Sequence, residues 1–142
     1  MLTPVTGPQS RVKPTSGRLR HRLLLVEEDA GDLRHYFGIL RAAGYKVVVA
    51  KSYPHALDLL EGEPFDLVIV GQGSPAFDGR AVVIRSRELN PRVPIVVVAR
   101  SHDIDCYLEA MELGAADYLE RGATPRDFMR AMDSHLRVAS AA

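Results

Sequence analysis

The sequence lacks the features that mark secreted and membrane-spanning proteins. Its 142 residues include a single cysteine, Cys106, so no disulfide can form within the chain. The longest apolar runs, such as 67–70 and 95–99, are far shorter than the ~20 residues that a helix needs to cross a bilayer. The first residues are polar and rich in proline and do not resemble a secretory signal. We therefore expect a cytoplasmic protein without a membrane association.

Acidic residues are absent from the first part of the chain, although the net charge of the whole is zero. Residues 1–22 contain five basic residues, and all 18 acids follow, against 13 remaining Lys and Arg. Residues 1–21 also hold three prolines, two glycines and no periodic apolar pattern, which predicts a flexible basic N-terminal arm. Five charges without aromatic neighbours indicate nucleic-acid binding only weakly, so we favour a solubilising role for this arm.

The remaining residues alternate between short apolar runs and longer amphipathic stretches. This alternation predicts β-α units around a parallel sheet, and the chain length suits one domain over 22–138 with a short tail over 139–142. Strands are expected at 23–26, 46–50, 66–70, 94–99 and 117–119. Helices are expected near 30–43, 52–61, 79–89, 103–113 and 125–138. The fold class is therefore α/β, a single (βα)5 domain.

Helix-capping residues support these boundaries. Thr124 with Pro125, and Asp29 with Asp32 three residues on, are typical of helix N-termini. Glycines at 44, 62 and 114 follow helical runs and are expected to end them in the left-handed conformation.

The loops after the strands carry a recognisable set of motifs. An acid pair follows the first strand, and Asp-Leu-Val-Ile-Val at 66–70 precedes the loop Ser-Pro-Ala-Phe-Asp-Gly at 74–79. Val-Pro at 93–94 opens the fourth strand, and Gly-Ala-Ala-Asp-Tyr-Leu spans 114–119. With this set of spacings, residues 22–138 resemble the receiver domain of bacterial response regulators. The resemblance implies a flavodoxin-like fold, with strand order 2-1-3-4-5 and helices on both faces of the sheet, and a role in two-component phosphorelay signalling.

Receiver domains generally accept a phosphoryl group on an aspartate after the third strand, beside a magnesium ion held by carboxylates. The resemblance places that acceptor at Gly71, four residues before Pro75, where no side chain is available. The acid pair falls on Glu27 and Glu28, the hydroxyl position on Ala99 and the lysine position on Arg121.

The aromatic switch residue of the family is retained as Tyr118. The missing groups predict a degenerate receiver, or pseudo-receiver, that binds a protein partner without accepting phosphate and performs no catalysis. We expect no cofactor and no structural metal, with Glu28 at most a weak magnesium ligand. We also expect Arg121 to pair with Glu27 or Glu28.

The alternative within the same family is an active phosphoreceiver with a non-standard acceptor such as Asp78. Asp78 followed by Gly79 is also a common turn sequence, and we favour the turn.

Other classes of function have weaker support. Ser74 and His102 do not belong to a nucleophile elbow, because proline follows the serine. The glycines at 71 and 73 are too few for a dinucleotide-binding loop, which argues against a flavin carrier. The five histidines show no zinc-ligand spacing, and Cys106 is expected to be a small apolar residue of the core.

Without an active phosphorylation site, function is expected on a surface. In the resembled family the face of the fourth helix, fifth strand and fifth helix binds partners. Candidate interface residues there are Tyr107, Met111, Arg126 and Arg130. The alternative is that the aromatic and methionine residues of this face are all packing residues of the core: Tyr107, Met111, Tyr118, Phe128 and Met132. The expected partner is a signalling protein, either a histidine kinase or a second copy. Nucleic acid would be a partner only through an output domain outside this sequence.

Overall fold

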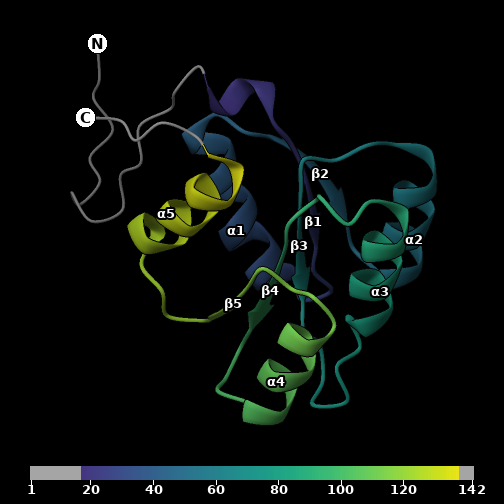
Figure 1. Cartoon of the computed structure of the whole chain (residues 1–142). Helices are drawn as coiled ribbons and strands as arrows, with labels where there is room; N and C mark the ends of the chain where they lie inside the picture. The colour runs from purple at the N-terminus through teal and green to yellow at the C-terminus, as the bar shows by residue number, and fades with distance from the viewer. Residues whose placement is uncertain (1–16, 138–142) are drawn as a thin grey trace.

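The computed structural model describes residues 17–137, which form a five-stranded parallel sheet flanked by helices (Figure 1). The strands are β1 (Arg22–Val26), β2 (Lys46–Ala50), β3 (Leu67–Gly71), β4 (Ile95–Ala99) and β5 (Asp117–Glu120). The helices are α1 (Ala30–Ala43), α2 (Tyr53–Gly62), α3 (Arg80–Leu89), α4 (Ile104–Glu112) and α5 (Pro125–Leu136). The sheet order is β2-β1-β3-β4-β5, which confirms the predicted fold class and strand order.

Two cores lie on opposite faces of the sheet. Along β1, Leu23 and Leu25 face one helix layer while Leu24 and Val26 face the other, because successive side chains of a strand alternate. The first core is closed by α1 and α5, and the second by α2, α3 and α4, as Figure 1 shows. The central strands β3 and β4 are buried along their whole length, as expected for a sheet covered on both faces.

The helix caps follow local sequence in most places. Asp29 and Thr124 accept hydrogen bonds from the backbone three residues on, and Gly44 and Gly114 have φ values of 105° and 102°. The cap expected at Gly62 is wrong. Helix α2 includes Gly62, and the chain leaves it through an extended Glu63, since the residue before Pro64 disfavours helical geometry.

The predicted boundary between arm and domain needs correction, because residues 17–21 pack on the domain. A short 3₁₀ turn, η2 (Arg18–Arg20), precedes β1, and Arg18 is only 4% exposed. Its guanidinium binds both carboxylate oxygens of Asp133 in α5, at 2.9 and 2.6 Å, and the carbonyl oxygen of Ala43 at the end of α1. The rest of the predicted arm (1–16) and the tail (139–142) lie outside the described residues.

At the other end, α5 stops at Leu136 and Arg137 adopts a left-handed conformation, two residues before the expected end. None of the helices within residues 17–137 is long and apolar enough to cross a membrane.

Candidate functional site

Parallel pairing brings the ends of four strands together at one edge of the sheet. Val26 is in register with Val70, Gly71 with Val98, and Ala99 with Glu120. The loops that follow β1, β3, β4 and β5 therefore start side by side, where ligands bind in open parallel sheets. The residues singled out in these loops by the sequence do gather at this edge.

The space beside Gly71 is filled by the carboxylate of Glu27, which directly follows the neighbouring strand β1. A Cβ atom at position 71 would lie 2.5 Å from Oε1 and 2.9 Å from Cδ of Glu27. Glu27 is buried, and its Oε2 accepts a hydrogen bond from the backbone N–H of Asp29 at 3.1 Å. The side chain that the resemblance would place on β3 is thus replaced in space by that of Glu27, the residue directly after β1.

Burial raises the pKa of Glu27 above its ordinary value of 4.5, and the hydrogen bond from Asp29 only partly offsets this effect. Nearby Asp32 and Asp29 raise the pKa further, while Arg100 lowers it. The second acid, Glu28, is exposed. The two members of the acid pair therefore lie in very different environments.

Arg121 does not pair with Glu27 or Glu28, so that prediction is wrong. Its Nη2 lies 2.9 Å from Oδ1 of the buried Asp32, in the first turn of α1. Arg100, directly after β4, binds the other oxygen of Asp32 at 3.0 Å and also Oδ1 of Asp29 at 2.6 Å. The carboxylate of Glu27 lies against Gly71 instead.

These four residues form an ion-pair cluster: Asp29, Asp32, Arg100 and Arg121. The hydrogen bond from the backbone of Asp32, and then Arg100, lowers the pKa of Asp29. The hydrogen bond to Asp32, and then the charge of Asp29, raises the pKa of Arg100. The cluster connects the loops after β1, β4 and β5.

The acids at this edge do not converge on a common point. Within residues 17–137, no group of three or more His, Cys, Asp or Glu side chains is arranged to hold a metal ion. The carboxylates of Asp29 and Asp32 are directed to guanidinium groups, and that of Glu27 is directed to the backbone of Asp29. These three carboxylates are therefore directed to protein partners and not to one common centre.

The loop after β3 is organised by Asp78. Its Oδ2 accepts a hydrogen bond from the backbone N–H of Ser74 at 2.8 Å, and this bond lowers its pKa. Ser74 Oγ in turn accepts from the N–H of Ala76. The turn that the sequence favoured at Asp78 and Gly79 is also present, and the backbone N–H of Arg80 closes it by donating to the carbonyl of Phe77 at 3.0 Å.

Tyr118 points inward to a side chain that the sequence reasoning missed. Its hydroxyl donates to Oε1 of Gln72 at 2.6 Å, and Nε2 of Gln72 donates to Oδ2 of Asp103 at 3.2 Å. Gln72 is only 7% exposed, although it directly follows Gly71 at a strand end. A polar residue between buried strand residues and a glycine-rich loop is the one sequence signal that could have singled it out.

An apolar surface lies on α4. Ile104, Tyr107, Leu108 and Met111 are between 37% and 57% exposed, at the spacing of one helix face. Arg126 and Arg130 are exposed on α5, whereas Phe128 and Met132 belong to the core. Two of the expected interface residues, Tyr107 and Met111, thus lie on this surface, and Ile104 and Leu108 join it.

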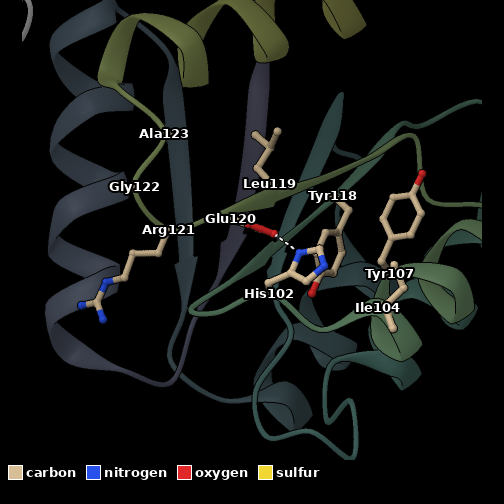
Figure 2. Close-up of a pocket in the computed structure, with 9 residues that line it drawn as sticks. All are labelled: His102, Ile104, Tyr107, Tyr118, Leu119, Glu120, Arg121, Gly122 and Ala123. Carbon is tan, nitrogen blue, oxygen red and sulfur yellow. Dashed lines mark hydrogen bonds and ion pairs between the residues drawn. The ribbon is translucent and has the colours of Figure 1, made fainter.

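Beside this surface is an open hollow of about 610 Å³, shown in Figure 2. Apolar atoms of Ile104, Tyr107, Tyr118 and Leu119 line it, and His102 and Glu120 form a pair across it at 2.6 Å. Arg121 lies at its rim, with the guanidinium directed away from the hollow toward α1 (Figure 2). His102 therefore pairs with Glu120 and not with Ser74.

The comparisons with known proteins agree with this geometry. A family model described as "Response regulator receiver domain" matches residues 23–133. Over 124 residues the chain is 31% identical to the alginate biosynthesis transcriptional regulatory protein AlgB of Pseudomonas aeruginosa, covering 87% of this chain and 28% of AlgB. It is also 31% identical to the transcriptional regulatory protein ZraR of Escherichia coli, over 75% of this chain and 23% of ZraR. The chain thus spans about a quarter of the length of these curated relatives.

Solved structures show the same fold. A response regulator receiver domain protein (CheY-like) from Methanospirillum hungatei superimposes with a TM-score of 0.76 at 24% identity, over 82% of this chain and 94% of that one. A putative response regulator from Chloroflexus aurantiacus gives 0.76 at 29% identity, over 82% and 98%. On its sequence, its strand order and the loops gathered at one edge of its sheet, the chain belongs to the response regulator receiver domain family.

Proposed function

We propose that this receiver domain acts in the cytoplasm by binding a signalling protein and does not accept a phosphoryl group. One observation carries the proposal: the carboxylate of Glu27 fills the space beside Gly71 where the family's acceptor side chain would stand. Phosphoryl transfer requires a positioned nucleophile and cations that neutralise the developing charge. A glycine provides no nucleophile, and the nearest arginines already pair with Asp29 and Asp32.

The other positions of the pocket support the same proposal. Ala99 provides no hydroxyl to bind a phosphoryl oxygen, and its carbonyl accepts the backbone N–H of Arg121 at 2.7 Å. The carboxylates at this edge form no common metal site within residues 17–137. We therefore expect the domain to need no magnesium for its function.

The proposed binding surface is the apolar face of α4 together with the adjoining hollow at β5. Exposed apolar and aromatic residues next to arginines are typical of protein interfaces. The expected partner is a histidine kinase or a second copy of this chain. An output through DNA would require a further domain, as in the longer relatives named as transcriptional regulators.

Phosphorylation can be tested directly. The full chain is incubated with acetyl phosphate and Mg²⁺, an active receiver domain serves as the control for the reagents, and intact mass is measured. We expect no phosphoryl adduct on the wild type. A stoichiometric adduct would overturn the proposal, and its loss in Asp78→Asn would establish the alternative acceptor. The variant Gly71→Asp tests whether a carboxylate added at position 71 of β3 is sufficient for the domain to accept a phosphoryl group.

The binding surface is tested separately in pull-down from the native cell and by sedimentation of the purified chain. Leu108→Asp on α4 should remove binding to the partner or to a second copy without loss of folding, because Leu108 is 57% exposed. Leu89→Asp is the matched control, since Leu89 is exposed at the end of α3. Equal binding by both variants would place the partner elsewhere.

A further inference from the structure

Gln72 joins three parts of the fold through one buried amide. Its backbone lies at the end of β3, where its N–H donates to the carbonyl of Val98 in β4 at 2.8 Å. Its side chain receives the hydroxyl of Tyr118 from β5 and donates to Asp103, which precedes α4. The amide is thus held from both ends while it is 7% exposed.

The direction of these hydrogen bonds is fixed by chemistry. An ionised carboxylate only accepts, so the NH₂ group of Gln72 must face Asp103. The amide oxygen then faces Tyr118, whose hydroxyl must donate. Burial raises the pKa of Tyr118 to about 12, so the hydroxyl keeps its proton at neutral pH. The two hydrogen bonds therefore run in one direction, from Tyr118 to Gln72 and from Gln72 to Asp103. We call these three side chains the hydrogen-bond relay.

Asp103 carries the connection into α4. It is the N-cap of that helix, and its Oδ1 accepts the backbone N–H of Cys106 at 3.1 Å. On the outer side, the ring of Tyr107 packs edge-on against the ring of Tyr118, with centroids 5.6 Å apart. The first turn of α4 is thereby fixed to β5 both by hydrogen bonds and by ring packing.

From this geometry we propose that Gln72 is a positioning residue that holds Tyr118 inward and fixes the first turn of α4. In receivers that switch, a bound phosphoryl group and a hydroxyl after β4 hold the aromatic residue of β5 inward. In this chain the relay would hold Tyr118 inward instead. It rests on the proposed function in one respect, because the surface it fixes is the proposed binding face. We therefore expect this face to keep one conformation without phosphorylation of the domain.

Cys106 provides a reporter for this relay. It is the only cysteine in the sequence, lies in the first turn of α4 and is 2% exposed. Its thiol donates to the carbonyl of Pro75 at 3.5 Å, and burial raises its pKa to about 11. A thiol reagent can modify it only when this part of the molecule opens, so the labelling rate measures that opening.

The experiment measures the labelling rate of Cys106 in the full chain with an aromatic disulfide reagent. The variants are Gln72→Leu, Tyr118→Phe and the double variant, and Tyr107→Phe is the matched control. The Tyr107 hydroxyl makes no hydrogen bond within the described part of the chain, whereas that of Tyr118 does. We expect Tyr118→Phe to raise the labelling rate about five-fold, because it removes one buried hydrogen bond. The double variant should be no faster than Gln72→Leu alone, because both changes break one relay.

Hydrogen exchange of backbone amides in α4 and α1, on the same variants, separates a local effect from general destabilisation. A rise confined to α4 supports the relay, and Tyr118→Phe supplies this test even where Gln72→Leu fails to fold. Rates within two-fold of the wild type, an equal rise with Tyr107→Phe, or equal faster exchange in α1 and α4 would each overturn it. Phosphorylation of the wild type would refute the proposed function and leave this measurement unaffected.

Discussion

Gly71 and Glu27 form a complementary pair, because the small residue on β3 leaves the space that the buried carboxylate directly after β1 fills. Since Gly71 ends β3 and has no positive φ, this close approach, and not backbone strain, disfavours a larger residue there. The pair is therefore a matter of volume and charge and not of backbone conformation.

A methyl group at position 71 should displace that carboxylate. Gly71→Ala forces Glu27 to move and to lose its hydrogen bond from Asp29, at a cost of about 1 kcal/mol in the free energy of unfolding. Gly38→Ala is the control: Gly38 lies in α1, and a Cβ added there has no atom within 4 Å. Because alanine favours the helix more than glycine does, the free energy of unfolding should rise by roughly 0.5–1 kcal/mol. Urea denaturation measures both. Equal effects of the two substitutions would contradict this account.

The raised pKa of Glu27 gives a pH dependence with a definite sign. The folded state binds the proton of Glu27 more tightly than the unfolded chain, so its contribution to stability is full below the ordinary value of 4.5. That contribution is lost as pH rises through the folded-state pKa. Glu27→Gln should therefore become more stable relative to the wild type as pH increases from about 4 to 7. Denaturation midpoints that keep a constant difference over this range would refute the assignment.

Several single-residue roles followed from local sequence, and others did not. Asp29 and Thr124 cap helices through bonds to residues three positions on, which a short sequence window reveals. Arg121 was assigned to the wrong acid because Glu27, Glu28 and Asp32 lie close together in the sequence and all far from Arg121, so sequence spacing could not choose among them. The choice among several nearby carboxylates depends on how each side chain turns.

At the scale of elements, α4 reverses the usual burial of an amphipathic helix. Its larger apolar residues face solvent, while the small residues Cys106 and Ala110 face the core. Apolar spacing alone favours burial of the larger stripe. The sequence therefore predicted the helix and named Tyr107 and Met111 as candidates, but only packing against the sheet shows which stripe is free.

The η2 turn is a second element whose packing on the domain is seen only in tertiary contacts, those of Arg18 with Asp133 and Ala43. Arg18→Ala should lower the free energy of unfolding by about 3 kcal/mol, because it leaves the mostly buried Asp133 without its guanidinium partner. Arg20→Ala is the matched control: Arg20 is exposed on the same turn, and its loss should change stability by at most about 0.5 kcal/mol. Chemical denaturation of the full chain compares them. Similar losses in both variants would show that η2 acts only by its helical turn.

For the molecule as a whole, the ion-pair cluster joins loops that start at three different strands. Because Asp32 has two guanidinium partners, either arginine alone can keep it paired. We expect Arg100→Ala and Arg121→Ala each to lower the denaturation midpoint slightly. The double variant should lower it by more than both effects combined, since the buried carboxylate then has no cation.

That double-variant comparison also has a built-in control. Asp32→Ala combined with both arginine substitutions removes the buried charge and should recover part of the lost stability. Strict additivity of the two arginine variants would show that Asp32 is not shared between them. The measurement is a urea midpoint for each of the variants under one salt concentration, because exposed ion pairs weaken with salt.

The sequence by itself determined the βα alternation, the sheet, most helix caps and the absence of a carboxylate at Gly71, since these depend on periodicity, short-range hydrogen bonds or the identity of a single residue. Tertiary structure alone decided that Glu27 fills the space at Gly71 and that Asp32 binds two arginines. It also decided that Gln72 connects Tyr118 to the start of α4 and that Arg18 packs on the domain. Each of these is a contact between side chains distant in sequence, and its partner is set by how the strands and helices are brought together.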